Sequence, residues 1–389
     1  MKIIYFTTAQ DEKDYRSFIK LWNYPLNSSN QNFHNKLIRS LAISNDVEVI
    51  SIRPFSRSNT KVRKLDKGTK ECGNITWHYL KRSGSKLVRN ININPQAKNV
   101  LSNIDLTDSI FLADTINPSV VACVNKMAKK YKRPVIGICT DSPSNISGTR
   151  RSYTLYLLSK TNNFNGYIAL TAGLNDLFNP EQKPAFVFEG LIEDEIPEAK
   201  KENERPYFFF GGALMEKYGV FNLIQAFKNL KNDDIDLYIC GHHGDVEKLR
   251  KEIKGYSNVK YLGLLPVNKV LQLEQQAIAS INPRPYSEDL DRFSLPSKTV
   301  EYMSAGRPVI SVKNTILMEK FPRYVTWLDS SSVDDIEKGL RKILKMDESQ
   351  QADYGAKIKK QAQDLYSLTS VNKQMQPFLS QFIKKDVVD

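Results

Sequence analysis

Two successions of short apolar segments and amphipathic segments constrain what this chain of 389 residues can fold into. In the first, apolar residues recur every four positions between residues 32 and 42, which predicts a helix packed on a sheet. Another helix is expected at 120–131, and apolar runs predict strands at 2–7, 46–52, 109–113, 134–139, 166–170 and 185–188. Regular alternation of this kind predicts a parallel sheet covered by helices on both faces.

A polar, acid-rich segment with two prolines, 193–206, interrupts the pattern and is typical of a linker. The alternation then restarts, with strands expected at 207–210, 235–240, 259–262, 278–282 and 308–311 and helices at 221–230, 246–254, 267–275 and 299–305. The fold class is therefore α/β with two doubly wound parallel sheets. We expect domains at 1–190 and 207–365, a linker at 191–206, and a helix in 366–389 that packs back toward the first domain. Such sheets bind ligands at the carboxyl ends of their strands, which predicts a nucleotide-sized ligand in a central cleft.

The net charge of +13 belongs entirely to the first half of the chain. Residues 1–190 contain 27 basic and 14 acidic side chains, whereas the remainder contains 29 of each. The segment 53–89 alone holds eleven basic residues against Asp66 and Glu71. A basic surface attracts phosphates of nucleic acid, of an anionic membrane face or of a phosphorylated lipid. A solvated lysine-rich loop is the alternative, but confinement of the charge to one half favours a partner.

Other classes of protein lack support in the sequence. No apolar run reaches the roughly 18 residues of a membrane span, and the first ten residues lack the features of a signal peptide. We therefore expect the mature chain to begin near Met1. The four cysteines are far apart, without the paired spacing of a zinc or redox site, which is typical of a reducing cytoplasm.

The first stretch with chemical potential is 207–227, where an apolar strand leads into Gly211 and Gly212 and then into a helix. Glycines let backbone N–H groups approach a ligand closely, and the helix N-terminus favours negative charge. Lys217 lies between them, where its ammonium group can meet a diphosphate. A tight turn with a solvated lysine is the alternative interpretation.

The second stretch is 281–311, in which Ser297 is placed to cap a helix that Gly306 ends. Lys298 and Glu301 are three residues apart and therefore share one face of that helix. A cation and a carboxylate at a helix start can bind a phosphate and a ribose diol, respectively. A surface ion pair is the alternative.

In this order and separation, the two stretches resemble the donor-nucleotide domain of GT-B glycosyltransferases, specifically the retaining family 4 of capsule and exopolysaccharide synthesis. The most specific match is LPSK..EYMSAG.PVI at 295–310. Supporting matches are YGV at 218–220 with LIQAF at 223–227, V.YLG..P at 259–266, NPR at 282–284, and the helix-like segment 27–42 on the acceptor side. The resemblance covers nearly the whole chain and implies two Rossmann-like domains that face a central cleft.

The resemblance also implies roles for individual residues. Glu301 would bind the ribose, Gly211 and Gly212 would lie under the diphosphate, and Lys217 and Lys298 would neutralise the leaving group. The segment 261–265 would frame the base. The remaining expected contacts are Gly241, Leu262, Gly263, Leu264 and Ser297 on the nucleotide side, and Asn32, His34, Asp141, Arg284 and Glu288 on the acceptor or donor-sugar side. For His34 ordinary packing is the alternative, and for Asp141 the capping of a turn.

Two departures from the family pattern concern this site. The first of the paired glutamates falls at Phe293, so Glu288, Asp289 or Asp291 would have to replace it from the adjacent loop. The arginine usually found after the first glycine is replaced by Gly212. Phosphate stabilisation would then depend on lysine and on backbone N–H groups.

The expected function is that of a retaining hexosyltransferase that uses a nucleoside diphosphate sugar, a UDP-sugar by preference, without a metal or cofactor. A polyprenyl-diphosphate-linked glycan would be the acceptor, at the inner face of the plasma membrane, where the basic half meets anionic lipid. The segment 150–160 would lie on that surface or pack on the first sheet. One rival is a non-catalytic GT-B partner of another transferase. Nucleic acid is not expected, because no recognition motif accompanies the charge.

Overall fold

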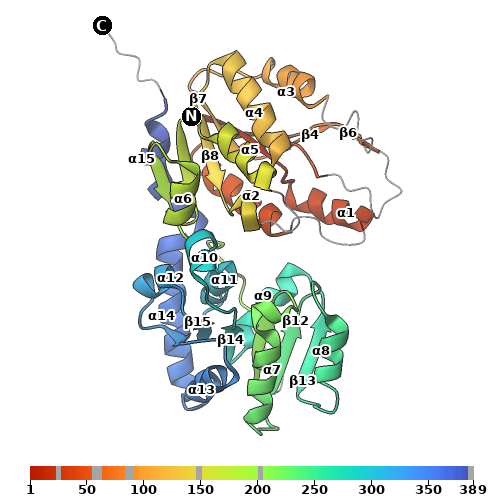
Figure 1. Cartoon of the computed structure of the whole chain (residues 1–389), viewed down its shortest axis with the longest axis vertical. Helices are drawn as coiled ribbons and strands as arrows, with labels where there is room; N and C mark the ends of the chain where they lie inside the picture. Colours follow the sequence, from red (N-terminus) through yellow and green to blue (C-terminus); the bar gives the residue numbers. More distant parts are fainter. Residues whose placement is uncertain (23–27, 55–63, 84–91, 146–150, 200–204, 384–389) are drawn as a thin grey trace. The chain divides into compact units, whose positions relative to one another are not determined.

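Two sheets, one mainly parallel and one wholly parallel, each in a unit of its own, form the framework of the protein (Figure 1). The computed structural model describes residues 1–22, 28–54, 64–83, 92–145, 151–199 and 205–383. The first unit comprises Met1–Leu191, Arg292–Ser294 and Leu368–Asp389, and the second comprises Ile192–Asp291 and Leu295–Ser367. Both units are α/β with helices on the two faces of the sheet, which confirms the predicted fold class.

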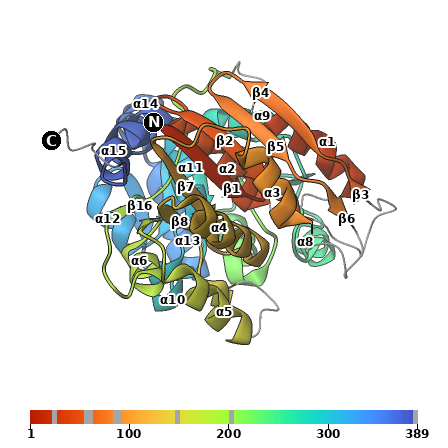
Figure 2. The same ribbon diagram turned by 90° about the horizontal axis from the view of Figure 1, so that it is seen from above.

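In the first sheet the strand order is β10-β9-β8-β7-β1-β2-β5-β4, and β1 (Lys2–Thr7) lies inside it (Figure 2). Alternate residues of β1 enter two different apolar clusters. Ile4 and Phe6 pack with the helices that follow β7, and Ile3 and Tyr5 pack on the other face. The remaining parallel strands are β2 (Asp46–Ser51), β5 (Ile75–Tyr79), β7 (Ser109–Asp114), β8 (Val135–Cys139), β9 (Gly166–Ala169) and β10 (Ala185–Val187).

The helices of the first unit follow from the same apolar spacing. They are α1 (Glu12–Trp22), α2 (Ser28–Leu41), α3 (Ile93–Leu101), α4 (Pro118–Tyr131), α5 (Arg151–Thr161), α6 (Ala172–Phe178) and α15 (Leu368–Ser380). Asn117 caps α4 by accepting hydrogen bonds from two backbone N–H groups of its first turn. Leu37 of α2 and Met375 of α15 are both fully buried in one cluster with Tyr5.

Part of the basic segment 53–89 is sheet, which the charge pattern did not predict. Strand β5 pairs in parallel with β2 and buries Trp77, while β4 (Gly68–Cys72) adds an antiparallel edge, and β3 (Lys64–Leu65) pairs with β6 (Arg82–Ser83). Lys70 forms ion pairs with Asp11 and Asp14 at the start of α1. Some of the positive charge is therefore neutralised within the unit.

The second sheet is wholly parallel, with strand order β13-β12-β11-β14-β15-β16. Its strands are β11 (Tyr207–Gly211), β12 (Asp236–Cys240), β13 (Val259–Gly263), β14 (Ala279–Asn282), β15 (Val309–Val312) and β16 (Val325–Leu328). Its helices are α7 (Val220–Asn229), α8 (Val246–Glu252), α9 (Val267–Gln276), α10 (Glu288–Phe293), α11 (Ser297–Ser304), α12 (Thr315–Lys320), α13 (Val333–Leu344) and α14 (Glu348–Tyr366). The strand order reverses between β11 and β14, and ligands of doubly wound sheets bind at such a reversal.

Three details differ from the predicted organisation. Residues 292–294 group with the first unit, because the carbonyl of Arg292 accepts a hydrogen bond from Thr171 Oγ1 at 2.7 Å. Ile192 belongs to the second unit, where its N–H donates to the carbonyl of Tyr366 at the end of α14. Glu288, Asp289 and Asp291 lie in the helix α10, not in a loop. Among the described residues, no helix has both the length and the apolar character needed to cross a membrane.

We expect Met375→Ala to lower the free energy of unfolding of the first unit by about 2–5 kcal/mol, because it leaves a cavity under α15. Lys373→Ala changes an exposed residue of the same helix and should alter this free energy by less than about 0.5 kcal/mol. Native-state hydrogen exchange in urea measures both values. Equal effects of the two substitutions would contradict the placement of α15 in the core of this unit.

Candidate functional site

The carboxyl end of β11 is fixed by a side chain from another element. The Tyr302 hydroxyl on α11 donates to the Gly211 carbonyl at 3.1 Å and accepts from the Gly211 N–H at 2.9 Å. Tyr302 is 1% exposed, and burial raises the pKa of its hydroxyl well above the usual value. The ring therefore joins α11 to the glycine loop as a neutral donor and acceptor.

Three strand ends approach one another at this edge through their backbones. The Gly212 N–H donates to the Cys240 carbonyl, and the Gly241 N–H donates to the Gly263 carbonyl at 2.9 Å. Gly241 has φ +147°, and a Cβ atom there would lie 1.9 Å from the Gly212 carbonyl oxygen. Only glycine fits this position. These backbone contacts bring together the predicted nucleotide-side residues Gly211, Gly212, Gly241 and Gly263.

A second close approach joins the loop after β11 to β14. Gly219 adopts φ +75° at the start of α7, and a Cβ atom there would lie 2.1 Å from the Pro283 carbonyl oxygen. The Arg284 guanidinium consequently lies 5.8 Å from the centre of the Tyr218 ring. Lys217 is exposed, with its ammonium 5.2 Å from the same ring. The YGV and NPR segments thus form one side of the site.

Lys298 and Glu301 are joined on α11 as their spacing predicts. Lys298 Nζ lies 2.9 Å from Glu301 Oε2, and the two side chains are 40% and 26% exposed. Burial disfavours the charged ammonium, but Glu301 and Glu274 outweigh this effect and raise the pKa of Lys298. Ser297 is not the cap that we expected. It is the first residue of the helix and is exposed, while Pro296 occupies the N-cap without a side-chain hydrogen bond.

Glu274 was missed by the sequence analysis. It lies on α9, is 0% exposed, and acts electrostatically on Lys298, Tyr302 and Cys240. A glutamate in an amphipathic helix is normally assigned to solvent. The sequence does carry a signal for its burial. Glu274 lies four residues after Val270 and three after Leu271, a spacing that puts it on the apolar face of the helix.

The predicted base-side residues lie at the end of β13. Leu262 packs against the apolar cluster of α9 and α11, whereas Leu264 is 59% exposed beside Gly263. The Tyr261 hydroxyl donates to the Gly241 carbonyl at 2.8 Å, which ties this strand end to the glycine loop. Within the described part of the chain, no three His, Cys, Asp or Glu side chains lie close enough to hold a metal ion.

The three candidates for replacing the first glutamate differ in their surroundings. Asp291 Oδ1 accepts hydrogen bonds from Asn314 Nδ2 at 2.6 Å and from the Thr315 N–H at 3.0 Å, so it supports α12. Glu288 and Asp289 are exposed at the start of α10. Phe293 packs against the apolar cluster of the first unit, which explains its apolar character.

In the first unit, α2 carries His34 into the interior, where it is 0% exposed. Its Nδ1 lies 2.6 Å from the Tyr5 hydroxyl and its Nε2 lies 3.7 Å from Asp114 Oδ2. Asn30 Nδ2 donates to the same carboxylate oxygen at 3.2 Å. Asp114, at the carboxyl end of β7, was missed, although an acid that directly follows an apolar run marks a strand end.

Asn32 and Asp141 are the other two acceptor-side candidates of the first unit. Asn32 is exposed on the first turns of α2. Asp141 follows β8, and its Oδ1 accepts a hydrogen bond from the Ser142 N–H at 2.8 Å.

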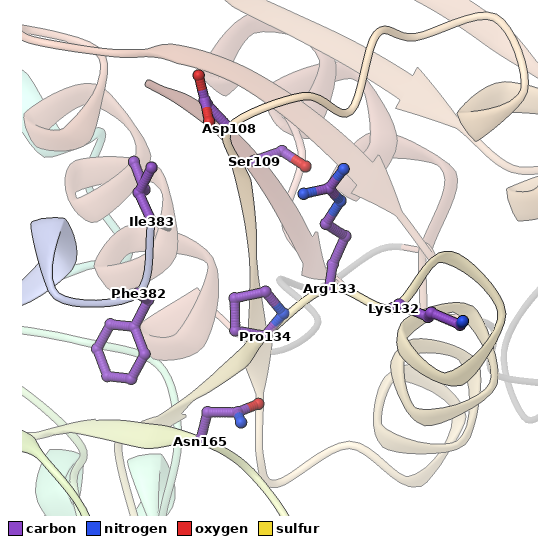
Figure 3. Close-up of a pocket in the computed structure, with 8 residues that line it drawn as sticks. All are labelled: Asp108, Ser109, Lys132, Arg133, Pro134, Asn165, Phe382 and Ile383. Carbon is purple, nitrogen blue, oxygen red and sulfur yellow. The ribbon is translucent and has the colours of Figure 1, made fainter. Parts of the chain in front are cut away.

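A cavity of about 410 Å³ lies elsewhere in the first unit (Figure 3). It is found at the amino ends of β7, β8 and β9, where Arg133 extends toward Ser109 and Phe382 forms an apolar wall. Its cations Lys132 and Arg133 share the lining with Asp108. Since it is at the opposite edge of the sheet from the strand carboxyl ends, it is separate from the candidate site.

Residues 192–361 match the model of the family described as Glycosyl transferases group 1, and this match begins at the first residue of the second unit. That unit is therefore similar in sequence to group 1 glycosyltransferases. A search of curated proteins finds no match.

Solved structures resemble the whole chain. OtsA in its apo form is 9% identical, with a TM-score of 0.71 over 99% of this chain and 100% of that chain. Sucrose-phosphate synthase from Thermosynechococcus elongatus is 11% identical, with a TM-score of 0.69 over 98% and 99%. HepE (Alr3699) from Anabaena, in complex with UDP and glucose, is 13% identical, with a TM-score of 0.65 over 98% and 100%. At these identities the likeness establishes the GT-B fold.

We expect Tyr302→Phe to lower the free energy of unfolding of the second unit by about 1–3 kcal/mol, because it leaves buried polar groups of Gly211 without partners. Tyr256→Phe removes the hydroxyl of an exposed tyrosine and should change this value by less than about 0.5 kcal/mol. Hydrogen exchange, analysed separately for each unit, measures the free energy of unfolding of both variants. A Tyr302→Phe protein as stable as the parent would show that the hydroxyl does not fix β11.

His34 should make the first unit sensitive to mild acid. Burial lowers the pKa of His34 below the ordinary 6.5, more than Asp114 raises it. As the pH falls, the unfolded chain therefore binds a proton at this imidazole before the folded chain does. The free energy of unfolding then falls as the pH decreases from about 7 toward 5, by at most about 1.4 kcal/mol per pH unit. His34→Gln should flatten this dependence, whereas His243→Gln, at an exposed histidine, should preserve it. Urea unfolding between pH 5 and 8 tests the difference, and an unchanged slope in His34→Gln would contradict the assignment.

Proposed function

We propose that this protein transfers a hexose, with retention, from a nucleoside diphosphate sugar to a lipid-linked glycan acceptor in the synthesis of a bacterial surface polysaccharide. The observation that carries the donor half of this proposal is the Lys298–Glu301 pair on the helix whose Tyr302 holds the glycine loop. A UDP-sugar is the preferred donor, since HepE has the same fold and its structure contains UDP and glucose. Retention and membership of family 4 follow from the sequence resemblance.

The transfer reaction requires the site to stabilise a departing diphosphate. When the bond between the anomeric carbon and the diphosphate oxygen breaks, negative charge develops on the leaving group. Lys217, Lys298 and the N–H groups near Gly212 are the groups that would stabilise it, and Glu301 would accept hydrogen bonds from the ribose hydroxyls. The acceptor hydroxyl then bonds to the anomeric carbon, and its proton passes to the departing diphosphate oxygen. No step in this scheme requires a metal or cofactor.

The first unit supplies the features that support an acceptor at an anionic membrane face. On α5, Leu155 and Tyr156 are 57% and 41% exposed between the basic residues Arg151 and Lys160. Leu157 of the same helix is fully buried. One face of α5 thus packs on the unit, while the other presents apolar and basic groups, which favours peripheral contact with anionic lipid on the cytoplasmic side.

A non-catalytic GT-B partner of another transferase is the second candidate function. The observation that favours it is Phe293, an apolar packed residue where the family pattern has its first glutamate. Such a protein would bind its partner or acceptor without turning over a nucleotide sugar. In the assay below, such a protein would therefore release no nucleoside diphosphate.

The test is release of nucleoside diphosphate from a panel of UDP-, GDP- and ADP-sugars with a lipid-linked acceptor present. We expect release from one donor, and a loss of about 100-fold or more in Lys298→Ala and in Glu301→Ala. Lys357→Ala removes a lysine from an exposed ion pair with Asp353 in the same unit and should leave the rate unchanged. Absence of release from every donor, together with no thermal stabilisation by any nucleotide, would favour the non-catalytic partner.

A further inference from the structure

The cavity of about 410 Å³ at the amino ends of β7, β8 and β9 takes no part in the donor scheme (Figure 3). Sites that hold small molecules have volumes of about 300–1,000 Å³. The walls of this cavity come from three distant parts of the chain: the turn before β7, the turn between α4 and β8, and the residues that follow α15. All three parts belong to the first unit, so the cavity is complete within that unit.

Two charged residues line the cavity in a backbone conformation that favours glycine. Asp108 has φ +49° and Lys132 has φ +52°, which makes them two of the four non-glycine residues with positive φ in the described part of the chain. Lys132 ends α4, at a position where glycine or asparagine is the usual residue. A side chain is unfavourable in this conformation, and residues held in it concentrate at functional sites. Both turns therefore carry a charged side chain into the lining against the local backbone preference.

Arg133 supplies a donor group that the first unit does not satisfy. Its Nε atom is buried without a hydrogen-bond partner, and Arg133 forms no ion pair with a carboxylate among the described residues. Its side chain extends toward Ser109 (Figure 3). The dipole of α4 does not account for this cation, because the exposed Lys129 and Lys130 already occupy the last turn. A buried donor without a partner is unfavourable, so we expect an acceptor from outside the chain, a water molecule or a ligand.

The wall that Phe382 forms favours a ligand over water. Phe382 and Ile383 give the cavity an apolar side, away from Arg133 (Figure 3). The Phe382 ring lies on Gly166 at the start of β9, where a Cβ atom would lie 2.5 Å from the ring atom Cζ. Gly166 thus leaves the space that the ring occupies. Water can satisfy a guanidinium group but not an aromatic wall, so the two sides together are suited to an organic anion.

We propose that this cavity is a second ligand site, which binds a small organic phosphate monoester with its phosphate on Arg133 and its organic part on Phe382. The guanidinium of an arginine matches two phosphate oxygens at once. A monoester carries close to two negative charges at neutral pH, which two cations, Arg133 and Lys132, balance better than they balance a singly charged carboxylate. The proposal goes beyond the transfer reaction, because substrates of doubly wound sheets bind at the carboxyl ends of the strands and this cavity is at the amino ends.

The remaining lining groups restrict the ligand further. Asn165 Oδ1 accepts from the Val135 N–H at 2.8 Å, which leaves the NH2 group of Asn165 able to donate to the phosphate. The Ser109 hydroxyl donates to the Leu106 carbonyl at 2.6 Å, so it can only accept from a ligand. Asp108 offsets one of the two cations. A lining with so little excess charge disfavours polyphosphates and nucleic acid and favours a small monoester.

Isothermal titration calorimetry of the whole chain with phenyl phosphate tests the site. We expect saturable binding with a Kd below about 1 mM, and weaker binding of inorganic phosphate and of phenol, because each offers only one half of the ligand. Arg133→Ala should raise the Kd for phenyl phosphate about tenfold or more, since it removes the charged donor. Lys129→Ala is the matched control: it removes an exposed lysine from the same helix end, outside the cavity, and should preserve the Kd.

Two further variants keep the test decisive if Arg133→Ala does not fold. Phe382→Ala should weaken the binding of phenyl phosphate but not of inorganic phosphate. Lys132→Gln changes an exposed residue and should raise the Kd for both by about two- to fivefold, as expected for an exposed ion pair. No binding of phenyl phosphate by the parent protein, or an equal loss in Arg133→Ala and Lys129→Ala, would overturn the proposal.

The location and the source of the phosphate are tested separately. Lys298→Ala should preserve the Kd for phenyl phosphate, because Lys298 belongs to the second unit. A loss of binding in this variant would place the probe in the donor site and overturn the proposal. Vesicles that contain phosphatidic acid present the same monoester on a membrane. Arg133-dependent binding of these vesicles without binding of phenyl phosphate would overturn a small ligand in favour of a lipid headgroup. None of these results depends on release of nucleoside diphosphate, so failure of the proposed function leaves this test intact.

Discussion

The candidate site depends on the two hydrogen bonds between the Tyr302 hydroxyl and the backbone of Gly211. A parallel strand ends with polar backbone groups that have no further ladder partner, and a buried group of this kind must find one. The hydroxyl satisfies the N–H and the carbonyl of one residue together. Because Lys298 and Glu301 lie on the same helix as Tyr302, the bond that ends β11 also sets the distance from the glycine loop to the ion pair.

Backbone proximity in the site leaves no room for side chains. The Cβ positions of Gly241 and Gly219 would fall 1.9 Å and 2.1 Å from carbonyl oxygens, so these turns require glycine for space as well as for conformation. The result is an edge formed by main-chain atoms, with charged side chains restricted to its borders. Recognition of a diphosphate by N–H groups is suited to such an edge, because these dipoles need no reorganisation when the ligand arrives.

The sequence predicted elements whose apolar pattern is sufficient to define them. Strands β1 and β11 are buried on both faces and appear as continuous apolar runs, and the predicted α/β class is confirmed. Contacts between distant residues escaped prediction. Strand β5 was hidden by the charges around it, although Trp77 buries one face. Glu274 was missed although its spacing from Val270 and Leu271 puts it on the apolar face of α9. The ion pair of Lys298 and Glu301 was predictable, because a spacing of three residues along one helix brings the two side chains together.

Charge also separates the two lysines of the proposed donor site. Lys298 forms an ion pair with Glu301, with 2.9 Å between Nζ and Oε2. Lys217 is exposed, and its ammonium lies 5.2 Å from the centre of the Tyr218 ring. In the proposed donor site, attraction of a free diphosphate would therefore fall mainly to Lys217 and the backbone N–H groups. In the proposed scheme Lys298 would contribute when the ribose draws Glu301 away, which would link recognition of the nucleoside to stabilisation of the leaving group.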